Sequence, residues 1–290
     1  MIDYTVIIPT LNAGGTIVRL IDSLNTQSIK PNLIYIVDSS SDDDTVSLLN
    51  KYDNVTVEVI NRSDFDHGKT RDYALRKTSS EFVVFMTQDA LPVNSTCMES
   101  LLACFKDERI AACSARQVAY DKSSSYEKLV RYYNYPSVSK IWNKRDVDKL
   151  GISSFLISDV ACAYRRSAYL SVGGFDYPID TNEDMLMAAK LLDKGYYLAY
   201  CADASVYHSH DYSFYEQYHR NYVIGRTLER YKDRLNSISE MSKGGSLFKN
   251  VSSDLLKEHK YLDELNFIFD CIARFTGNRI GRLSWKLGHK

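Results

Sequence analysis

The sequence predicts an α/β fold in which helices flank a mostly parallel central sheet, with a helical annex at the C-terminus. Over the first 115 residues, short apolar runs typical of buried strands alternate with apolar residues at helical spacing. Strands that alternate with helices form parallel sheets covered on both faces. From residue 214 onward the pattern is helical. We therefore expect a main domain over residues 1–215, with halves at about 1–115 and 116–215, and a helical extension over 216–290.

The individual elements follow from local patterns. A helix is predicted over 17–24, and Ser41 with Asp44 is the pattern of a capping box that opens another. A further helix is predicted over 181–192, whereas the Tyr-, Lys- and Ser-rich stretch 116–157 has no clear period. The predicted strands cover residues 5–8, 33–37, 55–60, 82–87, 110–115, 160–164 and 197–201.

Composition restricts the class of protein. The 290 residues include 36 basic and 37 acidic ones, a formal net charge of -1, so no overall field attracts nucleic acid and none is expected as a partner. The six cysteines form no C-x-x-C pair, which favours free thiols in a reducing cytoplasm. Nothing resembles a signal peptide or a membrane span. We therefore expect a cytoplasmic protein.

Polar residues follow the predicted strands at their carboxyl ends, which is where ligands bind to open α/β sheets. A carboxylate such as Asp38 could accept a hydrogen bond there from a pyrimidine base or from ribose. Acids and hydroxyls after a strand are also ordinary helix caps, and that alternative stays open. The residues at the strand ends are Pro9, Thr10, Asn12, Asp38, Ser39, Ser40 and Asp89.

The stretch F-D-H-G-K-T-R-D-Y-A at 65–74 is a second candidate ligand contact. Gly68 would let backbone approach a ligand, and Arg71 follows one turn into a helix. The Arg71 guanidinium could donate to a base carbonyl or a phosphate, or form a surface ion pair with a neighbouring acid.

A divalent metal site is predicted from residues far apart in the chain. Asp89 lies at a strand tip, and His208 and His210 would point the same way from an extended segment. With diphosphate oxygens and water completing the shell, this set would suit Mn²⁺ or Mg²⁺ and neutralise charge on a leaving diphosphate. The alternatives are a strand cap and ordinary core or surface histidines.

Glu183 and Asp184 fall in the first turn of the helix predicted over 181–192. They could cap that helix, with Thr181 and Asp184 forming a capping box. The functional alternative is that Asp184, with Glu183 beside it, acts as a general base.

Five aromatic residues are candidates for contact with sugar rings. Their rings could stack on sugars or could pack against the helical extension. The candidates are Tyr132, Tyr133, Tyr135, Trp142 and Phe155.

The C-terminal stretch 270–290 is basic and amphipathic. Interleaved with apolar residues, it could lie on an anionic membrane surface, at the inner face of the plasma membrane. An oligomer contact or a plain terminal helix is the alternative. The five basic residues, set against the single acid Asp270, are Arg274, Arg279, Arg282, Lys286 and Lys290.

Taken together, these motifs resemble the family 2 glycosyltransferases with the Rossmann-like GT-A fold, over roughly residues 3–215. The resemblance implies a nucleotide-sugar half at about 1–115 and an acceptor half at about 116–215. The stretches that carry it are V-I-I-P-T-L-N (6–12), V-D-S-S-S-D-D-D-T (37–45), V-A-C-A-Y-R-R-S-A-Y-L-S-V-G-G-F-D (160–176) and N-E-D-M-L-M-A-A-K-L-L-D-K-G-Y (182–196).

Three stretches narrow the resemblance to bacterial rhamnosyltransferases. Residues 65–72 are similar to F-N-H-G-G-T-R-N, residues 87–90 to the T-Q-D-A that replaces the usual D-x-D, and residues 208–213 to that subgroup's H-S-H-D-Y-S. The implied reaction is inverting transfer of L-rhamnose from dTDP-L-rhamnose to a polysaccharide or lipid-linked glycan. Asp66, Lys69 and Asp72 depart from the subgroup pattern, and Thr87 stands where the usual D-x-D begins with an acid.

The resemblance also implies roles for individual residues. Gln88 would contact ribose, Asp89 would bind the metal with His208 or His210, and Asp184 would be the base. The expected nucleotide-sugar contacts are Pro9, Thr10, Asn12, Asp38, Ser40, Asp66, Gly68, Arg71, Gln88 and Asp89.

Three other functions share some of these sequence features. A family 2 enzyme with a uridine-diphosphate hexose donor would share every motif except the rhamnosyl-like ones. A dinucleotide-dependent dehydrogenase is disfavoured because N-A-G-G-T is not G-x-G-x-x-G. An inactive carbohydrate-binding scaffold would keep the aromatic residues. It would have no reason to keep Asp89, Asp184 and the two histidines together.

Overall fold

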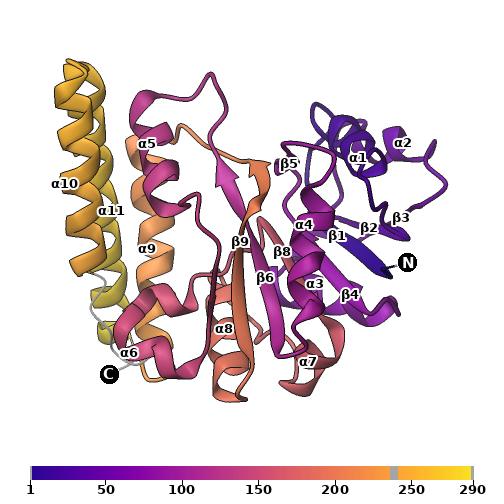
Figure 1. Ribbon diagram of the computed structural model, residues 1–290. Coiled ribbons are helices and arrows are strands. Elements are labelled where there is room, and N and C mark those ends of the chain that lie inside the picture. The colour runs from indigo at the N-terminus through magenta and orange to yellow at the C-terminus, as the bar shows by residue number, and fades with distance from the viewer. Residues whose placement is uncertain (1, 236–240, 289–290) are drawn as a thin grey trace.

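The computed structural model of the chain describes residues 2–235 and 241–288 (Figure 1). Within them one sheet runs in the strand order β3-β2-β1-β4-β8-β6-β9-β5, and β7 also pairs with β9. The strands are β1 (Tyr4–Thr10), β2 (Leu33–Asp38), β3 (Val55–Val59), β4 (Phe82–Met86), β5 (Leu91–Pro92), β6 (Ile110–Val118), β7 (Lys140–Trp142), β8 (Ala161–Arg165) and β9 (Tyr197–Tyr207).

Helices cover both faces of this sheet and continue beyond it into a C-terminal layer. In chain order they are α1 (Ile17–Asn25), α2 (Thr45–Leu49), α3 (His67–Lys77), α4 (Cys97–Ala103), α5 (Ser125–Asn134), α6 (Val147–Leu150), α7 (Arg166–Ser171), α8 (Glu183–Asp193), α9 (Phe214–Arg230), α10 (Met241–Lys257) and α11 (Tyr261–Gly288).

The N-terminal strands pair as expected. β1 pairs in parallel with β2 and β4, and β2 with β3. Their carboxyl ends therefore meet at one edge, where Thr10 lies opposite Asp38. Beyond β4 the sheet is mixed, because β8 runs antiparallel between β4 and β6 while β6 and β9 are parallel. The described chain thus has a mixed sheet with a parallel N-terminal part.

Burial on both faces explains why these strands are apolar without alternation. Ile7 and Phe85 belong to the core cluster on one face, and Val6, Ile8 and Val84 to the cluster on the other. Burying an aliphatic or aromatic side chain of this size contributes about 1.5–3 kcal/mol. Both faces therefore stabilise the edge at which the polar residues gather.

Two strands extend further than their sequence pattern predicts. β6 reaches Val118 rather than residue 115, and β9 reaches Tyr207 rather than residue 201. Their register shifts between Ala115 and Arg116, so part of β9 bulges before pairing resumes. Pairing then continues to His208, whose N–H donates to the carbonyl of Val118 at 2.9 Å.

Two other expectations about elements were wrong. The stretch 116–157 is not irregular, since it contains α5, β7 and α6. The predicted capping box of Ser41 with Asp44 does not form. α2 begins at Thr45, no side chain caps it, and the Ser41 hydroxyl donates instead to Asp38 at 2.6 Å.

The C-terminal helices form a layer beside the sheet, as expected for 216–290 (Figure 1). α9 and α11 pack so closely that a Cβ at Gly281 would lie 2.0 Å from the carbonyl oxygen of Tyr222. A small apolar cluster that includes Val130, Val251 and Phe267 joins this layer to α5. No described helix is both long enough and apolar enough to span a lipid bilayer.

Candidate active site

The loop after β4 is fastened to the loop after β1 by one side chain. Gln88 accepts a hydrogen bond from the Leu11 N–H at 2.8 Å and donates to the Leu11 carbonyl at 3.1 Å. These two bonds use both ends of the amide, so its orientation is fixed. The neighbouring Asp89 is consequently held at the edge of the sheet.

Asp38 organises the loop after β2. Its carboxylate is fully buried and accepts from the Thr10 hydroxyl at 2.8 Å, the Ser41 N–H at 2.8 Å and the Ser41 hydroxyl at 2.6 Å. In this arrangement Asp38 holds the loop, and the direct contact with a base expected from the sequence stays a prediction.

A small pocket of about 210 Å³ opens at this edge. Pro9, Thr10 and Gln88 line it, as expected. Arg62 and Phe65, which also line it, were not predicted. Both residues follow β3. Ligands bind at the carboxyl ends of the strands in open α/β sheets, so the same reasoning that was applied to β1 and β2 would have identified them. Leu11 and Ser39 complete the lining.

Asn12 and Ser40 shape these loops. Asn12 has a φ of 51° and Ser40 of 58°, conformations that non-glycine residues rarely adopt. The Asn12 side chain accepts from the Asp42 N–H at 2.9 Å, and the Ser40 hydroxyl donates to the Ile60 carbonyl at 2.7 Å. Both predicted site residues therefore stabilise the backbone next to the pocket without lining it.

Apart from Phe65, the residues of the stretch 65–74 do not line that pocket. Asp66 accepts from the N–H groups of Lys69 at 2.8 Å and Ile179 at 2.7 Å, so it caps α3 and holds the loop that precedes α8. A Cβ at Gly68 would lie 2.7 Å from the Asp176 carbonyl oxygen, so this glycine permits close packing rather than ligand approach.

Arg71 forms a buried ion pair instead of the expected surface one. Its Nη1 lies 3.2 Å from Oε1 of Glu183, and both side chains are almost fully buried. This buried ion pair joins α3 to α8. Arg71, which was expected to contact the nucleotide, instead connects the N-terminal half of the domain to the half that contains α8. Glu183, expected beside Asp184 as a catalytic group, is likewise committed to this pair.

Asp184 belongs to a cluster of acids. Its Oδ2 accepts from the Asp159 N–H at 3.3 Å, and its Oδ1 accepts from the Met185 N–H at 2.8 Å. The predicted capping box with Thr181 is absent, because Asn182 precedes α8 with a left-handed φ of 63° and makes no cap. Burial, together with the neighbouring charges of Glu183 and Asp159, raises the pKa of Asp184 well above its ordinary value.

Asp159 was not singled out by the sequence, because one acid after an irregular stretch carries no pattern. It is buried, and its Oδ1 accepts from the Tyr164 hydroxyl at 2.8 Å. Burial raises the pKa of Asp159 to about 7 against the opposing charge of Arg71. Asp159 therefore adds negative charge beside Asp184 as pH rises.

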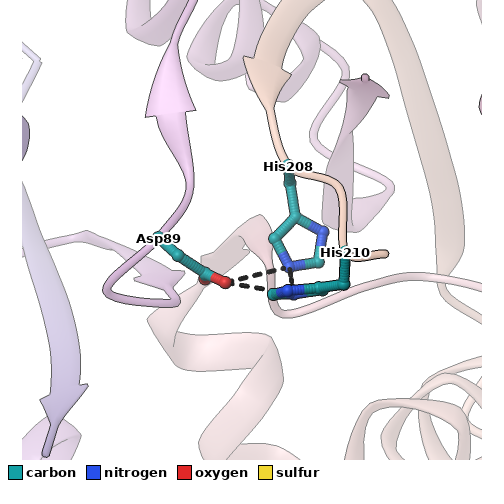
Figure 2. Close-up of side chains that lie close together, drawn as sticks. All are labelled: Asp89, His208 and His210. Carbon is teal, nitrogen blue, oxygen red and sulfur yellow. Dashed lines mark hydrogen bonds and ion pairs between the residues drawn. The ribbon is translucent and has the colours of Figure 1, made fainter. Parts of the chain in front are cut away.

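The predicted metal ligands come together (Figure 2). Oδ2 of Asp89 lies 3.1 Å from Nε2 of His210 and 3.5 Å from Nε2 of His208, and the two Nε2 atoms are 3.0 Å apart. Both histidines thus point the same way. A ligand atom from each of the three residues lies within 4.8 Å of the other two.

The electrostatics of this group suit a divalent cation. Burial would raise the pKa of Asp89, but the hydrogen bond from His210 and the nearby His208 outweigh it and hold that pKa below its ordinary value. Burial lowers the pKa of His208 to about 3, so its ring is neutral. An ionised carboxylate and imidazole nitrogens are ligands that Mn²⁺ accepts, so these residues fit such an ion.

Two larger cavities flank these groups. One, of about 570 Å³, is lined by Asp89, His210 and Gln88 together with the cationic Arg19 and Lys122.

The other cavity, of about 510 Å³, contains Asp184 and three of the expected acceptor residues, Tyr133, Tyr135 and Trp142. Tyr132 does not line it and is largely exposed, whereas Phe155 is 3 % exposed and packs in the core. The expected stacking of Phe155 on a sugar is therefore not supported.

The fold is that of the GT-A glycosyltransferases. The mannosyltransferase PcManGT from Pyrobaculum calidifontis, solved with GDP-Man and Mn²⁺, matches with a TM-score of 0.64 at 17 % identity, over 95 % of this chain and 86 % of its own. Residues 1–349 of Staphylococcus aureus TarS match with a TM-score of 0.57 at 18 % identity, over 99 % and 92 %.

The chain belongs to glycosyl transferase family 2, whose sequence model matches residues 5–173. It is 38 % identical to the O-antigen chain rhamnosyltransferase RfbN of Salmonella typhimurium, covering 76 % of this chain and 71 % of the relative. It is also 38 % identical to the O-antigen chain rhamnosyltransferase WbaN of Salmonella anatum, covering 78 % and 72 %.

We predict that Arg71→Met strongly destabilises the protein at neutral pH. The change leaves the buried carboxylate of Glu183 without its cation, which typically costs about 3–5 kcal/mol. Guanidinium unfolding followed by circular dichroism would measure this loss.

The double variant Arg71→Met/Glu183→Gln should recover most of the stability, because the Glu183 charge is removed together with the cation that compensates it. Arg62→Met provides a control, since Arg62 forms an exposed pair with Asp42. Its loss should cost less than about 1 kcal/mol. Equal losses for Arg71→Met and Arg62→Met would contradict the assignment.

Proposed function

We propose that this protein transfers L-rhamnose from dTDP-L-rhamnose to a hydroxyl of a bacterial cell-surface polysaccharide or lipid-linked glycan intermediate, with inversion. The observation that carries the proposal is the 38 % identity to two O-antigen chain rhamnosyltransferases over three quarters of the chain. The meeting of Asp89, His208 and His210 supports it. A cytoplasmic location agrees with six cysteines that are all unpaired.

The donor would lie along the edge of the sheet. Its base and ribose would occupy the small pocket, where Phe65 and Pro9 offer apolar surface and Arg62 a hydrogen-bond donor. Its diphosphate and sugar would occupy the cavity of about 570 Å³, beside Arg19 and Lys122. Direct contacts of Asp38, Asp66, Gly68 and Arg71 with the donor are not required in this arrangement.

Asp89, His208 and His210 would hold Mn²⁺ or Mg²⁺. When bound, the ion would neutralise charge that develops on the leaving diphosphate. The three side chains lie close together without an ion. Binding of a metal ion would therefore need little rearrangement of the protein.

Asp184 would act as general base. Its hydrogen bonds with the N–H groups of Asp159 and Met185 leave lone pairs on the carboxylate, and it lines the cavity of about 510 Å³ in which an acceptor would sit. The acceptor hydroxyl would lose its proton to Asp184 as its oxygen bonds to the anomeric carbon. The bond from that carbon to the diphosphate oxygen would break, and the diphosphate would leave with the electron pair.

The proposal is tested first by nucleotide release from the purified protein with Mn²⁺. We expect release from dTDP-L-rhamnose and not from UDP-glucose, UDP-galactose or UDP-N-acetylglucosamine, and we expect Asp89→Ala to abolish it. Preference for a uridine donor would overturn the rhamnosyl assignment and keep the reaction class. Absence of both release and calorimetric binding with all four donors would instead favour an inactive carbohydrate-binding scaffold.

Asp184→Asn should lower turnover by roughly 10²–10⁴-fold while leaving the donor dissociation constant unchanged, because a positioned base typically contributes that much. A base acts in its deprotonated form, so the wild-type rate should rise as pH increases through the raised pKa of Asp184. The residual activity of the variant should lack this rise. A variant rate close to wild type would show that Asp184 is not the base.

We also propose that α11 mediates a homodimer. Its outer face exposes an apolar stripe whose members are spaced three or four residues apart over 262–272 and again over 283–287. At about 1.5 Å per residue the helix is about 42 Å long, so two such faces bury on the order of 1,000 Å², the lower range of a specific interface. The stripe includes Leu262, Leu265, Phe269, Ile272, Leu283 and Leu287.

The charges of α11 favour a protein partner over an anionic membrane. Arg274 lies 2.6 Å from the carboxylate of Asp270, and Arg282 and Lys286 each lie 3.6 Å from that of Glu229. Three of the five basic residues noted in the sequence thus have acidic partners within the chain. Lys290, also noted there, lies outside the described residues.

Phe269→Glu should shift the protein from dimer to monomer in sedimentation velocity, because a two-fold interface places the new charge on both helices. Val59→Glu is the matched control, an exposed apolar residue on β3 at the far side of the molecule (Figure 1). A wild-type monomer over a micromolar concentration series would overturn the dimer. Co-sedimentation of that monomer with anionic vesicles, lost in Phe269→Glu, would assign the stripe to membrane contact.

A further inference from the structure

The buried amide of Gln117 lies between the histidine pair and the cavity that contains Asp184. Its Oε1 is 2.9 Å from Nδ1 of His208 and also accepts a hydrogen bond from Nη1 of Arg131. Its Nε2 donates to the Ser158 hydroxyl at 2.9 Å. Gln117 is 3 % exposed, so water does not compete for these bonds.

The chemistry of the three partners determines which way the amide faces. A guanidinium has only N–H donors, so the atom facing Arg131 must be the carbonyl oxygen of Gln117. The Ser158 hydroxyl can donate or accept and sets no constraint. The same oxygen faces Nδ1 of His208, so this nitrogen must carry a proton in order to donate. In a neutral imidazole, the lone pair then lies on Nε2.

From this geometry we infer that Gln117 and Arg131 are positioning residues, which fix the His208 ring in its Nδ1–H tautomer and direct the Nε2 lone pair toward a metal ion. The inference rests on the proposed metal role of Asp89, His208 and His210. It is supported by distance, since that same Nε2 lies 3.5 Å from Oδ2 of Asp89 and 3.0 Å from Nε2 of His210.

Arg131 is itself held in place. Its Nε donates to Oε1 of the buried Glu127 at 2.8 Å. At the start of the same helix, α5, the Ser124 hydroxyl donates to Asp211 at 2.9 Å, in the segment that carries the histidines. The helix that supplies Arg131 is therefore fastened to the loop that supplies the ligands.

This arrangement also connects the metal site with the acceptor side. Arg131 and Ser158 both line the cavity of about 510 Å³ that contains Asp184. A ligand that displaces Arg131 in that cavity would release the constraint on the Gln117 amide. Metal affinity and acceptor binding are therefore predicted to depend on one another.

The tautomer is tested in metal-free, full-length protein by two-dimensional NMR of ¹⁵N-labelled histidine. We expect His208 to show the Nδ1–H pattern in wild type and to lose it in Gln117→Met, which keeps the length of the side chain but removes the acceptor. Gln117→Glu should retain the pattern, because a carboxylate accepts from both neighbours. Persistence of Nδ1–H in Gln117→Met would overturn the inference.

Calorimetric titration with Mn²⁺ in the presence of dTDP supplies the second measurement. Loss of a partner that orients a histidine ligand typically weakens metal binding 10–100-fold, so Gln117→Met should raise the Mn²⁺ dissociation constant by that factor and Gln117→Glu by much less. Gln27→Met is the matched control, a buried glutamine that bonds to the Asn94 carbonyl and the Met98 N–H and lines neither of the two larger cavities.

The outcomes separate this inference from the proposed function. If Asp89→Ala weakens Mn²⁺ binding and Gln117→Met does not, the metal site stands and the positioning role is wrong. If Asp89→Ala changes nothing, the metal site itself is wrong, while the NMR measurement still decides the tautomer. Equal weakening in Gln117→Met and Gln27→Met would mean a general structural effect and would also overturn the positioning role.

Discussion

The pairing of β6 with β9 is the contact on which the site depends. It resumes after a bulge and continues to the hydrogen bond between His208 and Val118. That continuation carries the histidines to Asp89, which lies more than a hundred residues earlier in the chain, and carries Gln117 to the side of His208. A break in this ladder would separate the predicted metal ligands although each local segment kept its own conformation.

The parts of the fold that sequence predicts well are those set by local periodicity. β2 and β4 are continuous apolar runs because both faces of the sheet are buried there, and the position of Asp89 follows directly from where β4 ends. The histidine pair was also predictable, since an alternating segment points residues two apart in one direction. The parallel order then follows from the helices between the strands.

Other features depend on contacts that no local pattern encodes. α5 is short and amphipathic, and its apolar face packs against α10 and α11. Because these partners come from far along the chain, the local sequence around α5 shows no clear helical period. Arg71 looks like a ligand-binding residue, yet its carboxylate partner comes from α8, far along the chain. Asp38 has the residue type expected of a ligand contact, but burial beneath Thr10 and Ser41 is decided by how two loops meet.

The amide of Gln88 has a consequence for the shape of whatever binds. Among the residues that line the small pocket and the cavity beside Asp89, Gln88 is the one that both share. A molecule that fills both spaces must cross this amide, and two hydrogen bonds to the Leu11 backbone prevent it from swinging aside. The position of the Gln88 side chain is therefore fixed by the main chain of the loop after β1. A ligand that occupies both spaces must have the length and the bend that fit around this fixed amide.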